Sequence, residues 1–265
     1  MKLHYSITRA QSPIVAAAIH DGHIVDRTLR AYLTLQEHER FREEDPYTDY
    51  LAMLPVNRVT VKTSRFQLDL NRRRDSAIYH RPEDAWGLQV WQPELPNALR
   101  QELLQQYDAF YGDMAALLDD TIAAFGGFVV LDIHSYNYRR ESPDAEAETA
   151  ENPEINIGTA HNRAPWKTFG ERFTRFLTHH RISNHPADVR ENIKFGGGGF
   201  SEWINDRYGS YGCVLSLEFK KVFMDEWTGR VDIQHLNDLK QLLRCSIPYL
   251  LDMLDEKQKE RPDDH

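Results

Sequence analysis

The chain has 265 residues, which is enough for one large domain with a substantial core. Hydrophobic residues make up 41% of it, which excludes a disordered protein, and the net charge of -9 argues against nucleic-acid or membrane-surface partners. No apolar run reaches the roughly 18 residues of a membrane span. The N-terminal sequence MKLHYSITRAQSPIV lacks a signal peptide's apolar segment, so we expect a cytoplasmic protein. Two cysteines, Cys213 and Cys245, exclude a disulfide scaffold and a cysteine zinc site.

Short apolar segments with the character of strands alternate with longer segments of helical period. In chain order we expect a strand over 13–19, a strand over 57–63, a helix over 96–125, a strand over 128–133, a helix over 165–180, a strand over 213–219 and a helix over 231–257. Gly126 ends the first helix, and Pro248 is expected to interrupt the last one. The alternation predicts a single α/β domain with a mixed, mostly parallel central sheet flanked by helices.

Two polar segments stand outside this pattern. Residues 141–154 carry six acids and no base, which predicts a solvated surface loop; a lid over a site is the alternative. Residues 255–265 are expected to form a polar, frayed tail. The acid excess of the chain lies in this loop and around this tail, whereas residues 58–74 hold six bases and one acid. A site near that basic segment suits an anionic substrate.

Histidines stand at the ends of two predicted strands, where α/β proteins place their ligands. His20 follows the strand 13–19, and His134 follows the strand 128–133. Imidazole nitrogen is a good zinc ligand, and two such histidines on two strands are harder to explain as ordinary loop residues than one. Asp132 is a candidate to orient His134. Chemistry alone does not separate His20 from His23 as the ligand.

The acidic segment Glu43-Glu44-Asp45-Pro46 has two interpretations. Asp45 suits the N-cap of a short helix, with Pro46 at its first position. A carboxylate from this segment also suits the third ligand of a zinc site with two histidines and one acid, which leaves a fourth position for water.

Further polar residues suit binding and catalysis. An arginine run usually forms a solvated face, but beside a metal Asn71 and Arg72 would clamp a carboxylate. The four glycines 196–199 allow close approach of the backbone to a ligand, although they do not match a phosphate-binding loop. Glu218 lies within an apolar strand, where burial would raise its pKa and suit a general base; a structural salt bridge is the alternative.

The order of these motifs resembles that of the zinc carboxypeptidases and, more closely, that of the N-formylglutamate amidohydrolase family. The matching motifs cover about residues 13–225. They are His20-Asp21-Gly22, Glu43-Glu44-Asp45, Ser64-Arg65, Asp69-Leu70-Asn71-Arg72, Asp132-Ile133-His134-Ser135, Asn156-Ile157-Gly158-Thr159, Phe195-Gly196-Gly197 and Leu217-Glu218. Each motif is weak alone, but their ordered combination is fairly specific. The chain departs from the family pattern at Ile19 and Pro46, where the family has proline and tryptophan.

The resemblance implies a zinc carboxypeptidase-like fold and a Zn²⁺ cofactor. It implies that His20 and His134 are zinc ligands. Asp45 matches the acidic ligand best, and its neighbour Glu44 is the alternative.

The resemblance also implies hydrolysis of the amide bond in a small N-acyl amino acid such as N-formylglutamate, a substrate with a free carboxylate. Glu218 would be the general base, and Arg65 would help the zinc to stabilise the oxyanion. Asn71, Arg72 and Gly197 would bind the substrate. Two alternatives stay open: a metallocarboxypeptidase that acts on peptides or cell-wall fragments, and a non-catalytic binding protein with the same fold.

Overall fold

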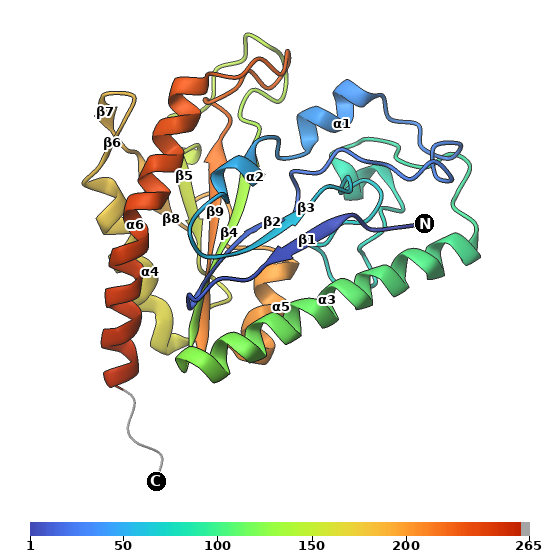
Figure 1. The fold of residues 1–265 in the computed structure, drawn as a ribbon. Helices are drawn as coiled ribbons and strands as arrows, with labels where there is room; N and C mark the ends of the chain where they lie inside the picture. Colours follow the sequence, from blue (N-terminus) through green and yellow to red (C-terminus); the bar gives the residue numbers. More distant parts are fainter. Residues whose placement is uncertain (261–265) are drawn as a thin grey trace.

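The computed structural model describes residues 1–260, and its centre is a seven-stranded sheet of order β1-β3-β2-β4-β9-β5-β8 (Figure 1). The strands are β1 (Tyr5–Thr8), β2 (Ile14–Ala18), β3 (Asn57–Val61), β4 (Phe128–Tyr136), β5 (Ile155–Gly158), β8 (Val189–Glu191) and β9 (Gly212–Lys220). The central strands β3, β2, β4 and β9 are parallel, whereas β1 and β5 run antiparallel to their inner neighbours. The expected mixed, mostly parallel sheet is confirmed.

Helices cover both faces of this sheet. The α-helices are α1 (Glu37–Glu43), α2 (Thr48–Leu51), α3 (Asn97–Phe125), α4 (Lys167–Thr178), α5 (Gly199–Tyr208) and α6 (Ile233–Lys259). Short elements complete the chain: the 3-10 turns η1 (Pro82–Ala85), η2 (Thr149–Glu151) and η3 (Ala164–Trp166), and the hairpin of β6 (Arg181–Ile182) with β7 (His185–Pro186). In Figure 1, α4 and α6 lie on one face, and α3 and α5 on the other.

The alternation of side chains along β4 explains where the polar site forms. Val129, Leu131 and Ile133 point into the core beneath α4 and α6. On the opposite face, Val130 joins the core beneath α3 and α5. Farther along this second face, the side chains become polar at the carboxyl end of the strand, and β9 shows the same change at Ser216 and Glu218. Neighbouring parallel strands therefore present polar groups at one edge of the sheet.

Several sequence expectations need correction. Pro248 lies inside a continuous α6 and does not interrupt it. The helical segments before and after Pro248 both pack on the core, through buried residues such as Leu243 and Leu250, and this packing stabilises the helix. The same helix extends to Lys259, so the start of the expected polar tail is helical, and residues 261–265 lie outside the described residues. β4 extends to Tyr136, so His134 lies within the strand and does not follow it.

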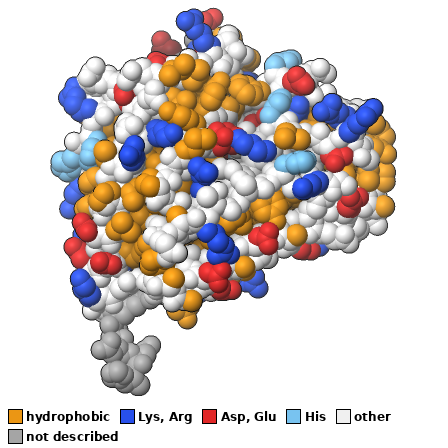
Figure 2. Space-filling model, in the orientation of Figure 1, with side chains coloured by type: hydrophobic (Ala, Val, Ile, Leu, Met, Phe, Trp, Pro, Cys, Tyr) orange, Lys and Arg blue, Asp and Glu red, His pale blue; other side chains and the backbone are white. Residues whose placement is uncertain are grey.

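The visible surface of the molecule carries charges of both signs (Figure 2). Figure 2 shows basic side chains interspersed with acidic and hydrophobic ones over the visible face, with no uniform negative field. Within residues 1–260, no helix combines the length and hydrophobicity that a membrane crossing requires.

Candidate active site

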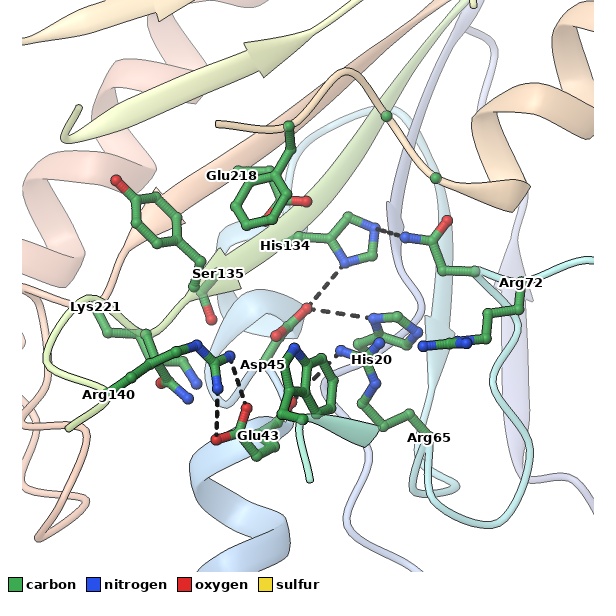
Figure 3. Close-up of a pocket in the computed structure, with 17 residues that line it drawn as sticks. His20, Glu43, Asp45, Arg65, Arg72, His134, Ser135, Arg140, Glu218 and Lys221 are labelled. Carbon is green, nitrogen blue, oxygen red and sulfur yellow. Dashed lines mark hydrogen bonds and ion pairs between the residues drawn. The ribbon is translucent and has the colours of Figure 1, made fainter. Parts of the chain in front are cut away.

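Three side chains from distant parts of the chain meet at the carboxyl edge of the sheet. His20 follows β2, Asp45 lies between α1 and α2, and His134 lies in β4; all three are buried. Nδ1 of His134 lies 2.9 Å from Oδ2 of Asp45, and Nδ1 of His20 lies 3.6 Å from the same oxygen (Figure 3). One ligand atom from each residue lies within 4.8 Å of the others, so this cluster can hold a metal ion.

Backbone contacts hold Asp45 at this point. Its N–H donates to the carbonyl oxygen of His20 at 3.0 Å. Its own carbonyl oxygen accepts from the Thr48 hydroxyl at 2.7 Å. Asp45 is not the cap of α2, because Tyr47 takes that position in a left-handed conformation. The N-cap interpretation is therefore wrong, and the side chain of Asp45 is free to face the histidines.

Two further carboxylates orient the imidazoles. Nε2 of His20 lies 2.8 Å from Asp69, and Nε2 of His134 lies 2.8 Å from Asp132. Because a carboxylate accepts hydrogen bonds, these contacts place an N–H at Nε2 of each ring and turn Nδ1 toward Asp45. Within the described residues, Nδ1 of His20 is buried and has no hydrogen-bond partner. A bound metal ion would satisfy this nitrogen, so the residues fit a metal.

The electrostatics of the cluster also favour a bound cation. Burial opposes the charged form of His134, but the carboxylates of Asp132 and Asp45 outweigh it and raise the pKa of His134 well above its ordinary value. Burial likewise opposes ionisation of Asp45, yet contacts with His134 and His20 hold the pKa of that carboxyl below its usual range. A proton on His134 or a metal ion can balance these carboxylates, and metal binding displaces the proton.

The other acid of the sequence motif points elsewhere. Glu44 is buried, and its carboxylate accepts from the Ser64 hydroxyl and lies 2.5 Å from Nδ1 of His23. The structure therefore brings His20 and Asp45 together and pairs His23 with Glu44. The adjacent residues Glu44 and Asp45 therefore point to different partners, because the backbone changes direction at the end of α1.

Glu218 lies directly opposite His134 in the register of β9 with β4. Its carboxyl group lines the same cavity as His20, Asp45 and His134 (Figure 3). Burial raises the pKa of Glu218 to about 7, more than the nearby His134 lowers it. Within residues 1–260, no arginine or lysine forms an ion pair with Glu218, so the salt-bridge alternative does not describe this residue.

The cavity in front of the cluster has a volume of about 330 Å³. Its wall carries four cationic side chains: Arg65, Arg72, Arg140 and Lys221. Figure 3 shows the first two on one side of Asp45 and the last two on the other. None of the described residues 141–154 lines the cavity, so nothing supports the alternative that this acidic loop is a lid.

The predicted clamp residues both reach the cavity. Oδ1 of Asn71 accepts from the N–H of Phe200 at 3.1 Å, and its Nδ2 lies 3.5 Å from Nε2 of His134. Arg72 donates to the carbonyl oxygen of Asp84 and leaves about a third of its side chain exposed. Asn71 is therefore held beside the histidine, while Arg72 keeps an accessible edge.

The glycine-rich turn packs against these residues. A Cβ atom at Gly198 would lie 2.3 Å from Oδ1 of Asn71, so only glycine allows this approach. Gly197 lines the cavity and has a φ of +116°, a conformation that favours glycine. The backbone of this turn therefore packs closely against the residues of the cavity.

Arg65 shares the carboxylate that orients His20. It donates to Asp69 at 2.9 Å and to the Tyr79 hydroxyl at 3.1 Å, while it lines the cavity. Its guanidinium is thereby fixed near the cluster, where it can donate to an oxygen of a bound ligand.

Lys221 and Arg140 also line the cavity, although no sequence motif indicated them. Nζ of Lys221 donates to the carbonyl oxygens of Arg42 at 2.6 Å and Glu44 at 2.8 Å, which ties the end of α1 to the strand of the predicted base. Burial lowers the pKa of Lys221 to about 8. Arg140 forms an ion pair with Glu43 at 2.9 Å. The sequence signal for Lys221 is its position shortly after the predicted strand 213–219 that carries Glu218.

Comparison with known proteins places this chain in a family. A search of curated proteins found no match. The structure of N-formylglutamate amidohydrolase from Ralstonia eutropha JMP134 is similar, with a TM-score of 0.70 and 16% sequence identity over 94% of this chain and 98% of that chain. Gene product Atu2144 from Agrobacterium tumefaciens gives a TM-score of 0.65 and 15% identity over 96% and 94%. These likenesses show a shared fold. The family model "N-formylglutamate amidohydrolase" matches residues 12–224, and the chain therefore belongs to this family.

Proposed function

We propose that the protein is a zinc-dependent amidohydrolase that cleaves the amide bond of a small N-acyl amino acid such as N-formylglutamate. The observation that carries this proposal is the position of Glu218 beside the His20, Asp45 and His134 cluster, within one cavity. The family supports the reaction type. The cavity of about 330 Å³ suits a small acyl amino acid.

The three ligand side chains suit zinc. Two imidazoles and one carboxylate form the ligand set of many catalytic zinc sites, and Asp69 and Asp132 supply the outer contacts that such histidines need. A zinc ion held there would lower the pKa of a water molecule and polarise the scissile carbonyl.

The remaining steps of hydrolysis are assigned to side chains that line the cavity. The carboxylate of Glu218 accepts a proton from the attacking water, and the protonated group returns it to the nitrogen of the leaving amine. Arg65 donates hydrogen bonds to the oxyanion of the tetrahedral intermediate. Arg72 and Asn71 hold the substrate's free carboxylate, which places the amide in front of Glu218.

The rate of hydrolysis should depend on the protonation of Glu218. Burial raises its pKa from 4.5 to about 7. At pH values below its pKa the carboxyl group is protonated and cannot act as a base. We expect kcat/KM to rise with pH, with a midpoint between 4.5 and about 7, since a cation at the cluster favours the charged form. Initial rates between pH 4.5 and 8 test this. A pH-independent rate across this range would contradict the assignment.

Loss of the carboxylate clamp should depend on the substrate. We expect Arg72→Ala to lower kcat/KM for N-formylglutamate by roughly 10- to 100-fold, the loss of a charged hydrogen bond. For the derivative of N-formylglutamate whose α-carboxylate is converted to a carboxamide, kcat/KM should fall far less. Arg73→Ala is the matched control, because the exposed Arg73 pairs with Glu202 outside the cavity. Equal losses on both substrates would remove Arg72 from the clamp.

A substrate panel tests the proposed function as a whole. Purified zinc-loaded protein is assayed with N-formylglutamate, N-acetylglutamate and a dipeptide with C-terminal glutamate. We expect the N-formyl compound to be hydrolysed fastest. Preferential hydrolysis of the dipeptide would instead establish a carboxypeptidase, and binding without hydrolysis of any of them would establish a binding protein.

A further inference from the structure

Trp86 lines the cavity in an unusual backbone conformation. It follows η1 with φ 54° and ψ 31°, in the left-handed region that large residues rarely adopt, and Gly87 after it has a φ of 88°. The residue is 43% exposed although it belongs to the cavity wall. A strained backbone and an exposed aromatic surface in a cavity are typical of residues that contact ligands.

Two arginines hold the indole ring in place. The guanidinium carbon of Arg65 lies 4.8 Å from the ring centroid of Trp86, and that of Arg140 lies 5.3 Å from it. Figure 3 shows these arginines on either side of Asp45. Each guanidinium also has a carboxylate partner, which fixes its position: Asp69 for Arg65 and Glu43 for Arg140. The ring therefore contacts two anchored cations.

Aromatic contacts support the ring from beneath. The rings of Phe66 and Tyr79 each lie 6.5 Å from that of Trp86, and both residues are buried. The Tyr79 hydroxyl donates to Asp69, the carboxylate that orients His20. The indole is thus fixed relative to the cluster of His20, Asp45 and His134, and it lines the same cavity as His20 and Glu218.

We propose that Trp86 is a specificity-determining residue whose ring packs against the hydrocarbon side chain of the bound N-acyl amino acid. This inference rests on the proposed function, since it places the substrate in the cavity beside His20 and Glu218. The ligand class is an acyl amino acid with two or more methylene groups in its side chain. A substrate without a side chain, such as N-formylglycine, gains nothing from this contact.

Kinetics with two substrates separate this role from a structural one. In zinc-loaded protein, Trp86→Ala should raise KM for N-formylglutamate on the order of tenfold, while KM for N-formylglycine changes less than about threefold. Trp86→Phe should keep KM for N-formylglutamate close to the wild-type value, because a phenyl ring also covers a hydrocarbon chain. Unchanged zinc content and far-UV circular dichroism establish that each variant is folded. Equal effects on both substrates, or no effect on either, would overturn the proposal.

Tryptophan fluorescence tests the contact without requiring turnover. Titration of N-formylglutamate into the Glu218→Gln protein should change its emission. The change should disappear when Trp86→Phe is added. The change should persist when Trp203→Phe is added instead. Trp203 is a matched control, since the guanidinium carbon of Arg207 lies 5.3 Å from its ring centroid but Trp203 does not line the cavity. Persistence of the change in the Trp86→Phe protein, or no change in the Glu218→Gln protein, would contradict the proposal. A Trp86-dependent change without hydrolysis by wild type would overturn the proposed function and leave this contact standing.

Discussion

Replacement of Glu218 by glutamine is expected to lower kcat/KM for N-formylglutamate by roughly 10²- to 10⁴-fold, the usual contribution of a positioned general base. Glutamine has nearly the same shape but cannot accept the proton of the attacking water. Glu218 lies opposite His134 in the sheet, and burial raises its pKa to about 7, which suits proton transfer near neutral pH. The rate of formate release at a saturating substrate concentration gives the effect on kcat, and the rate at a low concentration gives the effect on kcat/KM.

The same variant should still bind zinc, because the carboxyl group of Glu218 is not one of the three ligand groups. Elemental analysis of wild type, Glu218→Gln and the exposed-surface control Glu171→Gln should give equal zinc contents. An active Glu218→Gln protein would exclude this residue as the base. A loss of zinc in that protein would show that Glu218 is a ligand.

Replacement of Asp45 by asparagine is expected to weaken zinc binding by roughly 100-fold or more, since even outer contacts of metal ligands contribute 10- to 100-fold. Oδ2 of Asp45 is the atom that both imidazoles face, at 2.9 and 3.6 Å. Without this charge, His20 and His134 are two neutral ligands, which hold zinc poorly. Competition with a chromogenic chelator measures the affinity directly, and hydrolysis should fall with zinc occupancy.

Glu44→Gln is the matched control for this experiment. Glu44 precedes Asp45 in the chain and is equally buried, but its carboxylate faces His23 and Ser64. Zinc affinity should therefore change little in Glu44→Gln. Zinc loss in Glu44→Gln together with full retention in Asp45→Asn would exchange the roles of the two acids.

The long central elements were predictable because their signals are local. The apolar runs of β4 and β9 and the helical spacing of α3 extend over many residues, so the period alone identifies them. The short strands β5 and β8 carry no such period. They form by pairing in turn, β5 on β9 and β8 on β5. Helix α5 begins at Gly199 within the glycine-rich turn, where composition predicts a loop.

The meeting of His20, His134 and Glu218 was predictable for a different reason. Histidines at strand ends and the order of the motifs indicated His20, His134 and Glu218, and the parallel strands bring these residues to one edge. The preference for Asp45 over Glu44 came from the resemblance alone, since residue types do not show how the chain turns after α1. Arg140 and Lys221 were missed because their partners lie in α1 and the segment after it, about 100 or more residues earlier in the chain.

Formate release from N-formyl-L-glutamate, followed before and after metal removal, tests the central claim most directly. Untagged protein is treated with a chelator until elemental analysis detects no metal, and zinc is then returned in stoichiometric amount. We predict that hydrolysis is lost with the metal and returns with one zinc ion per chain, and that the Asp45→Asn protein does not recover at this zinc concentration. Full activity in the metal-free protein would contradict the account.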